Sequence, residues 1–143
     1  MTPEQIKIIK LTFSQAVTNK DAVGRMFYDR LFAVAPEARA LFKGDIDDQS
    51  RKLMDTLALA VGMLRDMPTL IPTLETLAVR HVAYGVKDEH YDLVGQVLLW
   101  TLEQGLGPAF TSDAKAAWTA LYGTVAGVMR KAASGAAARP KVA

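Results

Sequence analysis

The stretch LAVRHVAYGV, Leu77 to Val86, places His81, one of the two histidines in the chain, among Leu, Val and Ala. Apolar residues recur three and four positions apart here, which predicts a helix with one buried face, and Gly85 is a typical helix terminator. A buried imidazole must satisfy two ring nitrogens. The Leu77 carbonyl, four residues back, can accept from one nitrogen and leave the other for a metal. Taken alone, a helical histidine is more often a hydrogen-bonded core or surface residue than a metal ligand.

The same helical spacing continues through the chain, and alternation typical of strands is nearly absent, so an all-α fold is expected. Thr2, Pro3 and Gln5 predict a capped helix start. Further helices are predicted near 21–35, 49–65, 72–83, 89–104 and 111–133, with a short helical turn over 36–42. We expect Asp47 or Asp48 to cap the helix at 49, and Pro68 and Pro72 to make 65–72 a connector. Gly123 and Gly127 are expected to let two helices approach closely.

Composition predicts one soluble domain. The 143 residues are 50% apolar and 22% charged, with a net charge of +2, so neither nucleic acid nor a membrane is an expected partner. The absence of cysteine excludes disulfides and thiolate metal sites and suits a cytoplasmic location. LALAVGML (57–64) is far shorter than the roughly 18 apolar residues of a membrane span. We assign residues 1–134 to the domain and 135–143 to a flexible C-terminal tail.

Six blocks carry a resemblance to a known family: FYDRLF (27–32), PEARALF (36–42), QSRKLM (49–54), LAVRHVAYGV (77–86), HYDLVGQVLL (90–99) and AAWTALYG (116–123). In this order and spacing they resemble a bacterial single-domain globin, related to the haem domain of flavohaemoglobins, over residues 6–129. The resemblance implies a globin fold of about seven helices around a haem pocket, with His81 as the metal ligand. A haem iron needs only one protein ligand. Without a C-x-x-C-H motif, the cofactor would be non-covalent haem b.

The resemblance also assigns the residues that surround the haem. Phe42 would pack on the porphyrin, while Tyr28, Gln49 and Leu53 would form the distal pocket. A phenol or an amide can donate a hydrogen bond to a polar diatomic ligand, and this combination favours dioxygen over carbon monoxide. Read without the family, Tyr28 is a half-buried aromatic and Gln49 a solvated residue.

On the proximal side, Tyr91 matches a tyrosine that flavohaemoglobins link to the proximal histidine and to a glutamate in the last helix. Counted from Trp118, that glutamate position is Ala133, with Ala132 beside it. The carboxylate network therefore cannot form, which favours ligand binding over oxygen activation.

Other polar residues have weaker assignments. Arg51, Lys52, Arg80 and Tyr84 could pair with haem propionates, although solvated helix residues are the simpler interpretation. His90 is expected to cap a helix or to lie at the surface. Trp100 and Trp118 are assigned to the core or to helix interfaces.

The expected function is reversible binding of dioxygen, nitric oxide and carbon monoxide at ferrous haem, for oxygen storage or transport. An alternative is nitric oxide detoxification to nitrate by a nitric oxide dioxygenase, which would require a separate flavin reductase. A third hypothesis is a haem-free interaction module with a globin-like fold, in which a histidine such as His81 would not be expected.

Overall fold

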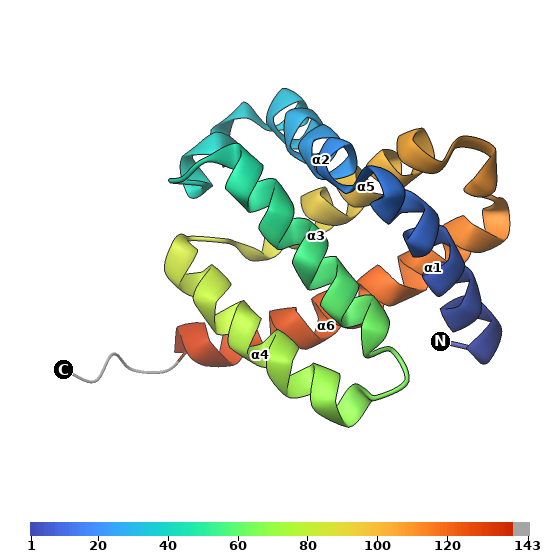
Figure 1. The fold of residues 1–143 in the computed structure, drawn as a ribbon. Coiled ribbons are helices and arrows are strands. Elements are labelled where there is room, and N and C mark those ends of the chain that lie inside the picture. Colours follow the sequence, from blue (N-terminus) through green and yellow to red (C-terminus); the bar gives the residue numbers. More distant parts are fainter. Residues whose placement is uncertain (139–143) are drawn as a thin grey trace.

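The computed structural model describes residues 1–138, and this part of the chain contains helices and no β-strand (Figure 1). The α-helices are α1 (Pro3–Ala16), α2 (Lys20–Val34), α3 (Ile46–Gly62), α4 (Met67–Tyr84), α5 (Asp88–Leu106) and α6 (Ser112–Ala138). Three 3₁₀ helices complete the set: η1 (Val17–Asn19), η2 (Pro36–Leu41) and η3 (Gly107–Ala109). The all-α fold class is confirmed. Within residues 1–138, no helix has the length and apolarity that a bilayer span requires.

The helices cross in two groups that share α6 (Figure 1). α2 packs on α3 and α5, α1 packs on α6, and α4 packs almost entirely on α6. Although α3 and α4 follow each other in the chain, they make few contacts with each other. Each is amphipathic, so the faces they turn toward one another include apolar side chains that the other helix does not cover.

The buried side chains form two separate clusters. The large cluster joins α1, α2, α3, α5 and α6 and includes Ile9, Phe13, Phe27, Tyr28, Leu31, Met54, Leu98 and Trp118. The small cluster joins α4 and α6 to the end of α3 and the start of α5; its buried members are Ala60, Leu70, Leu74, Ala78, Tyr91, Ala126 and Met129. Tyr122 and Val125 of α6 are packed against both clusters. The core is therefore divided where α3 and α4 make few contacts with each other.

Several helix signals act as the sequence predicts. The Thr2 hydroxyl accepts from Gln5 N at 3.1 Å, and the Gln5 side chain accepts from Thr2 N at 3.0 Å. Gly85 ends α4 with φ 91°, a left-handed conformation that glycine adopts without steric cost. Trp118 is buried, and its Nε1 donates to Thr12 Oγ1 at 2.8 Å, which ties α6 to α1. His90 accepts from Lys87 N at 2.8 Å and so caps the start of α5.

Two predicted helix boundaries are wrong. α3 begins at Ile46 because Asp45, not Asp47 or Asp48, supplies the cap: its carboxylate accepts from Asp47 N at 2.9 Å. The later aspartates then lie in the first turn, where negative charge is favoured. The predicted connector 65–72 is mostly helix, since α4 includes both prolines. Pro68 lies in the first turn, where its missing N–H is not needed, and Pro72 gives up one backbone hydrogen bond.

The last helix is longer than predicted. α6 continues to Ala138, so residues 135–138 of the predicted tail are helical, and residues 139–143 lie outside the described part of the chain.

The close helix contact predicted at Gly123 and Gly127 is also wrong. A Cβ at either position would meet nothing within 4 Å. The close approach occurs instead at Gly95 of α5, where a Cβ would lie 2.6 Å from the Tyr122 ring of α6. The small side chain is needed where α5 meets α6.

We therefore expect Gly95→Ala to destabilise the protein by about 1–3 kcal/mol, because the added methyl overpacks the contact with Tyr122. Gly127→Ala is the matched control: it adds the same methyl in open space and should stabilise the helix by about 0.5–1 kcal/mol. Urea denaturation measures both changes. Equal free energies of unfolding for the two variants would contradict the assigned contact.

Candidate functional site

His81 lies on the last turn of α4 and is partly buried. Its Nδ1 lies 2.8 Å from the Leu77 carbonyl oxygen. Because a carbonyl can only accept, Nδ1 must carry the proton and donate it. Burial lowers the pKa of His81, while the bond to Leu77 raises it by a smaller amount. A neutral ring with its proton on Nδ1 presents the Nε2 lone pair, which is the form that binds a metal ion.

Tyr28 lies on α2 within a group of aromatic rings. Its ring centroid is 5.2 Å from that of Phe42, 5.0 Å from that of Phe27 and 5.9 Å from that of Phe32. The side chain is 5% exposed. Burial raises the pKa of Tyr28 to about 12. The phenol therefore remains a neutral hydrogen-bond donor at any physiological pH.

Gln49 and Leu53 lie one turn apart on α3, and both are partly buried. Leu53 and Phe42 pack against the large cluster, to which Tyr28 belongs. The residues predicted for the distal pocket, Tyr28, Gln49 and Leu53, thus come from α2 and α3. Phe42, predicted to pack on the porphyrin, lies between η2 and α3. Together they provide a phenol, an amide and apolar surface.

A groove of about 360 Å³ separates the second half of α3 from α4. It is lined by Thr56, Leu59, Ala60, Leu70, Thr73, Leu74, Thr76, Leu77 and Arg80. Its volume is within the range of about 300–1,000 Å³ that is usual for small-molecule sites. Its lining includes Leu77, whose carbonyl fixes the His81 ring, but neither His81 nor Tyr28, Phe42, Gln49 or Leu53.

Tyr91 belongs to the small cluster, together with Ala78 of α4. It is 7% exposed, and its hydroxyl is buried without a hydrogen-bond partner among the described residues. Burial raises the pKa of Tyr91, while the Arg130 cation opposes this rise. Ala132 and Ala133 pack against the same cluster. The structure thus brings the tyrosine close to the alanines that stand where the flavohaemoglobin pattern has a carboxylate.

The polar residues predicted to meet a haem edge are at the surface. Arg80 is exposed on α4 and lines the groove. Tyr84 is 60% exposed, and its ring centroid lies 5.9 Å from that of His81. Lys52 is exposed on α3. Arg80 and Tyr84 are therefore the two that lie near both His81 and solvent.

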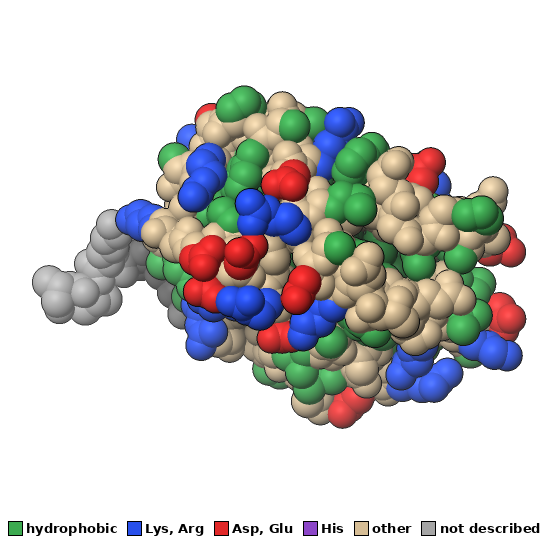
Figure 2. All heavy atoms as spheres, turned by 45° about the horizontal axis from the view of Figure 1, so that its top comes forward, with side chains coloured by type: hydrophobic (Ala, Val, Ile, Leu, Met, Phe, Trp, Pro, Cys, Tyr) green, Lys and Arg blue, Asp and Glu red, His purple; other side chains and the backbone are tan. Residues whose placement is uncertain are grey.

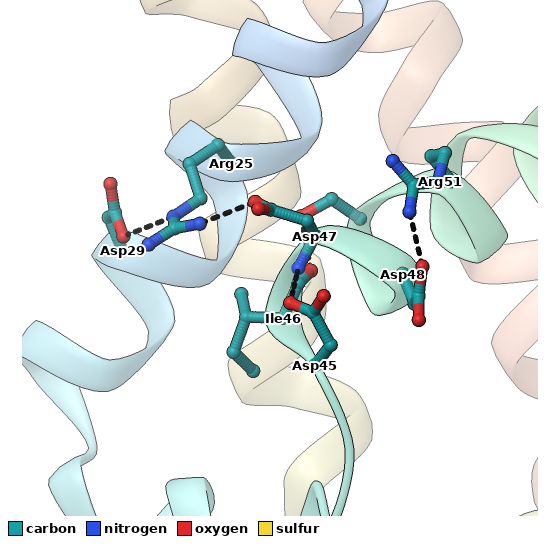
Figure 3. A network of polar contacts seen from close by, with 8 residues as sticks. Arg25, Asp29, Asp45, Ile46, Asp47, Asp48 and Arg51 are labelled. Carbon is teal, nitrogen blue, oxygen red and sulfur yellow. Dashed lines mark hydrogen bonds and ion pairs between the residues drawn. The ribbon is translucent and has the colours of Figure 1, made fainter.

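Arg51 is already paired with Asp48, at the start of α3, where an exposed charge network joins α3 to α2 (Figure 3). In this network Arg25 lies between Asp29 at 3.3 Å and Asp47 at 2.5 Å. Acidic and basic side chains also lie side by side on the face drawn in Figure 2. Exposed pairs of this kind contribute little to stability and have no evident role in the site.

The residues present fit a haem. A planar apolar ring with polar edges needs apolar walls, one nitrogen ligand and space on the opposite side. The leucines of the α3–α4 groove would supply apolar walls, and Nε2 of His81 would be available as the ligand. Within residues 1–138, no group of three or more His, Cys, Asp or Glu side chains could hold a metal ion by itself.

Sequence reasoning missed two sets of contacts. Phe27 and Phe32 surround Tyr28, and the FYDRLF block contained the signal because it places three aromatic residues on α2. Tyr122 and Arg130 of α6 hold Tyr91, a long-range contact that no local pattern reveals.

Comparison with known proteins agrees with the resemblance to globins. A protein-family model described as Globin matches residues 25–129. A flavohemoprotein of Bordetella parapertussis is 35% identical over 133 residues, which cover 90% of this chain and 33% of the relative. A flavohemoprotein of Vibrio cholerae is 32% identical over 125 residues, covering 85% of this chain and 32% of the relative. The chain thus spans about a third of the length of these curated relatives.

Solved structures are similar over nearly the whole chain. A bacterial globin from Campylobacter jejuni superposes with a TM-score of 0.85 at 26% identity, covering 96% of this chain and all of that one. An engineered carbene transferase from Rhodothermus marinus, named as a candidate nitric oxide dioxygenase, superposes with a TM-score of 0.87 at 22% identity, covering 96% of both chains. The second likeness concerns the fold alone.

The buried imidazole should make the stability of the haem-free protein depend on pH. Because burial lowers the pKa of His81 below its usual 6.5, the unfolded chain binds this proton first as the pH falls. The free energy of unfolding of the wild type should therefore decrease more steeply below pH 6.5 than that of His81→Leu. Urea denaturation between pH 8 and about pH 5 measures both slopes, and equal slopes would contradict the buried neutral ring.

Proposed function

The chain belongs to the globin family, and we propose on this basis that residues 1–134 form a domain that binds one haem b non-covalently between α3 and α4. The observation that carries the proposal is the hydrogen bond from His81 Nδ1 to Leu77, which leaves Nε2 as a ligand. When bound, haem supplies an iron with one vacant coordination position, where dioxygen, nitric oxide and carbon monoxide bind reversibly. We assign the metal-binding role to His81.

The chain's own residues would then select among these gases. Tyr28, with a pKa of about 12, is a neutral donor, and Gln49 carries a second donor on α3. Hydrogen bonds from these groups slow the release of a ligand whose outer atom gains negative charge, and carbon monoxide gains least. Leu53 and Phe42 would exclude water from the same space. We infer that oxygen binding, for storage or transport, is the function of the domain.

The propionates of the porphyrin would lie at the exposed edge. Arg80 and Tyr84 are the groups available there, since both lie near His81 and reach solvent. A guanidinium suits a carboxylate.

Nitric oxide dioxygenase activity is the second candidate, favoured by the similarity to flavohemoproteins. It would require electrons from a separate flavin reductase in the cytoplasm. The proximal side argues against it as the main function: the Tyr91 hydroxyl has no partner within residues 1–138, and Ala133 stands at the carboxylate position. A second-shell carboxylate would increase electron donation by the proximal imidazole and so favour oxygen activation.

The two histidines of the chain provide a matched test. His81→Ala should abolish the normal visible spectrum of the haem-loaded protein, and added imidazole should partly restore it by entering the vacated space. His90→Ala should leave the spectrum unchanged, because His90 only caps α5. An unchanged spectrum in His81→Ala would eliminate His81 as the ligand. Absence of haem binding in the wild type would favour the haem-free interaction module.

Tyr28→Phe should accelerate dioxygen release about fivefold, since one hydrogen bond of about 1 kcal/mol is lost. Carbon monoxide release should change much less. Ser14→Ala is the control, because it removes an exposed hydroxyl on α1 that has no part in the proposed pocket. Stopped-flow measurement of both gases checks this, and equal dioxygen rates in wild type and Tyr28→Phe would remove Tyr28 from the distal role.

A further inference from the structure

Arg130 connects α6 to the first turn of α5 by several contacts. Its Nη2 donates to Asp92 Oδ1 at 2.7 Å and to the Asp88 carbonyl at 3.1 Å. Its Nε lies 3.2 Å from Asp88 Oδ1. The side chain is 31% exposed, whereas those of Asp88 and Asp92 are 80% and 71% exposed. The guanidinium is thus the best buried member of this charged group.

The same guanidinium faces Tyr91. The Arg130 carbon Cζ lies 5.6 Å from the centre of the Tyr91 ring. From the same helix, the Tyr122 hydroxyl donates to the Tyr91 carbonyl at 2.5 Å, and the Tyr122 ring fills the space above Gly95. Tyr91 is therefore held by α6 at its backbone and at its ring, while its hydroxyl remains buried and unpartnered within the described residues.

The charge beside Tyr91 is positive. Ala132 and Ala133 supply no carboxylate, and Arg130 places a cation over the ring. A cation beside a phenol stabilises negative charge on its oxygen, so it makes the hydroxyl a better donor and a poorer acceptor. The proton of the His81 imidazole is directed at the Leu77 carbonyl and not at this hydroxyl.

We propose that Arg130 is a positioning residue that orients Tyr91 on the proximal side and, by its positive charge, favours the ferrous form of the bound haem. The proposal rests on the proposed function, since it assumes that haem binds through His81. Its basis is the set of contacts from Arg130 to Asp88, Asp92 and the Tyr91 ring. With haem bound through His81, a positive charge on this side of the fold would oppose the extra charge of the ferric state, by an amount that falls with its distance from the iron.

Substitutions of opposite sign test the proposal by spectroelectrochemistry of the haem-loaded protein. Arg130→Met leaves Asp88 and Asp92 uncompensated and should shift the midpoint potential to more negative values. Asp92→Asn, at an exposed position, removes a negative charge and should shift it to more positive values. Arg130→Lys keeps the charge and should retain the wild-type potential, even though it loses the paired geometry. If Arg130 had only a structural role, Arg130→Met and Arg130→Lys would both lower the stability of the protein. The midpoint potential would then not shift in opposite directions in Arg130→Met and Asp92→Asn.

A second readout uses the haem-free protein. Arg130 lowers the pKa of Tyr91 against the effect of burial, so Arg130→Met should raise the alkaline midpoint of the tyrosine titration that Tyr91→Phe removes. If Arg130→Met does not fold, Asp92→Asn and Arg130→Lys decide the result.

The outcomes separate the two proposals. If the wild type binds no haem, or if His81→Ala leaves its spectrum intact, the proposed function fails. If haem binds through His81 while Arg130→Met and Asp92→Asn keep the wild-type potential, the role of Arg130 alone is overturned.

Discussion

The hydrogen bond from His81 Nδ1 to the Leu77 carbonyl, 2.8 Å long, is the contact on which the chemistry of the site depends. It fixes the ring, sets the proton on Nδ1 and leaves Nε2 with a lone pair. The surrounding apolar side chains keep the ring neutral by lowering its pKa. An imidazole in this state can bind a metal ion through Nε2, and one nitrogen ligand from the protein is sufficient for a haem iron.

The division of the core into two clusters explains the space between α3 and α4. α3 packs on α2 and α4 packs on α6, so the two helices leave a groove between them. The large cluster carries the phenol of Tyr28, whereas the small cluster carries Tyr91 on the side of α4. α6 contacts both clusters, through Trp118 in one and Tyr122 in the other. The fold thus keeps the cluster that contains Tyr28 apart from the cluster that contains Tyr91, and α6 fixes their relative positions.

Local signals in the sequence predict most of the helices, because caps and apolar spacing act over a few residues. The Thr2 cap, the Gly85 terminator and the Leu77 partner of His81 all follow from such signals. Prolines are harder to interpret: the cost of Pro72 inside α4 is one hydrogen bond, which packing of Leu70 and Leu74 offsets.

Contacts between distant helices could not be predicted in the same way. Position 95 requires a small residue because the Tyr122 ring, distant in sequence, lies against it. The sequence around Arg130 also does not indicate that its guanidinium lies over the Tyr91 ring. Similarly, the spacing of Tyr28 and Gln49 does not reveal that they share a pocket; the family resemblance suggested it, and their roles remain a proposal. Local chemistry is therefore readable from sequence, whereas the partners of a buried side chain require the fold.

A crystal structure of the protein reconstituted with haem tests the central claim most directly. The predicted result is an iron bound by Nε2 of His81, with Nδ1 still donating to Leu77 and with Tyr28 and Gln49 facing the opposite side of the porphyrin. A structure in which the His81 ring points to solvent, or in which side chains fill the space between α3 and α4, would contradict it.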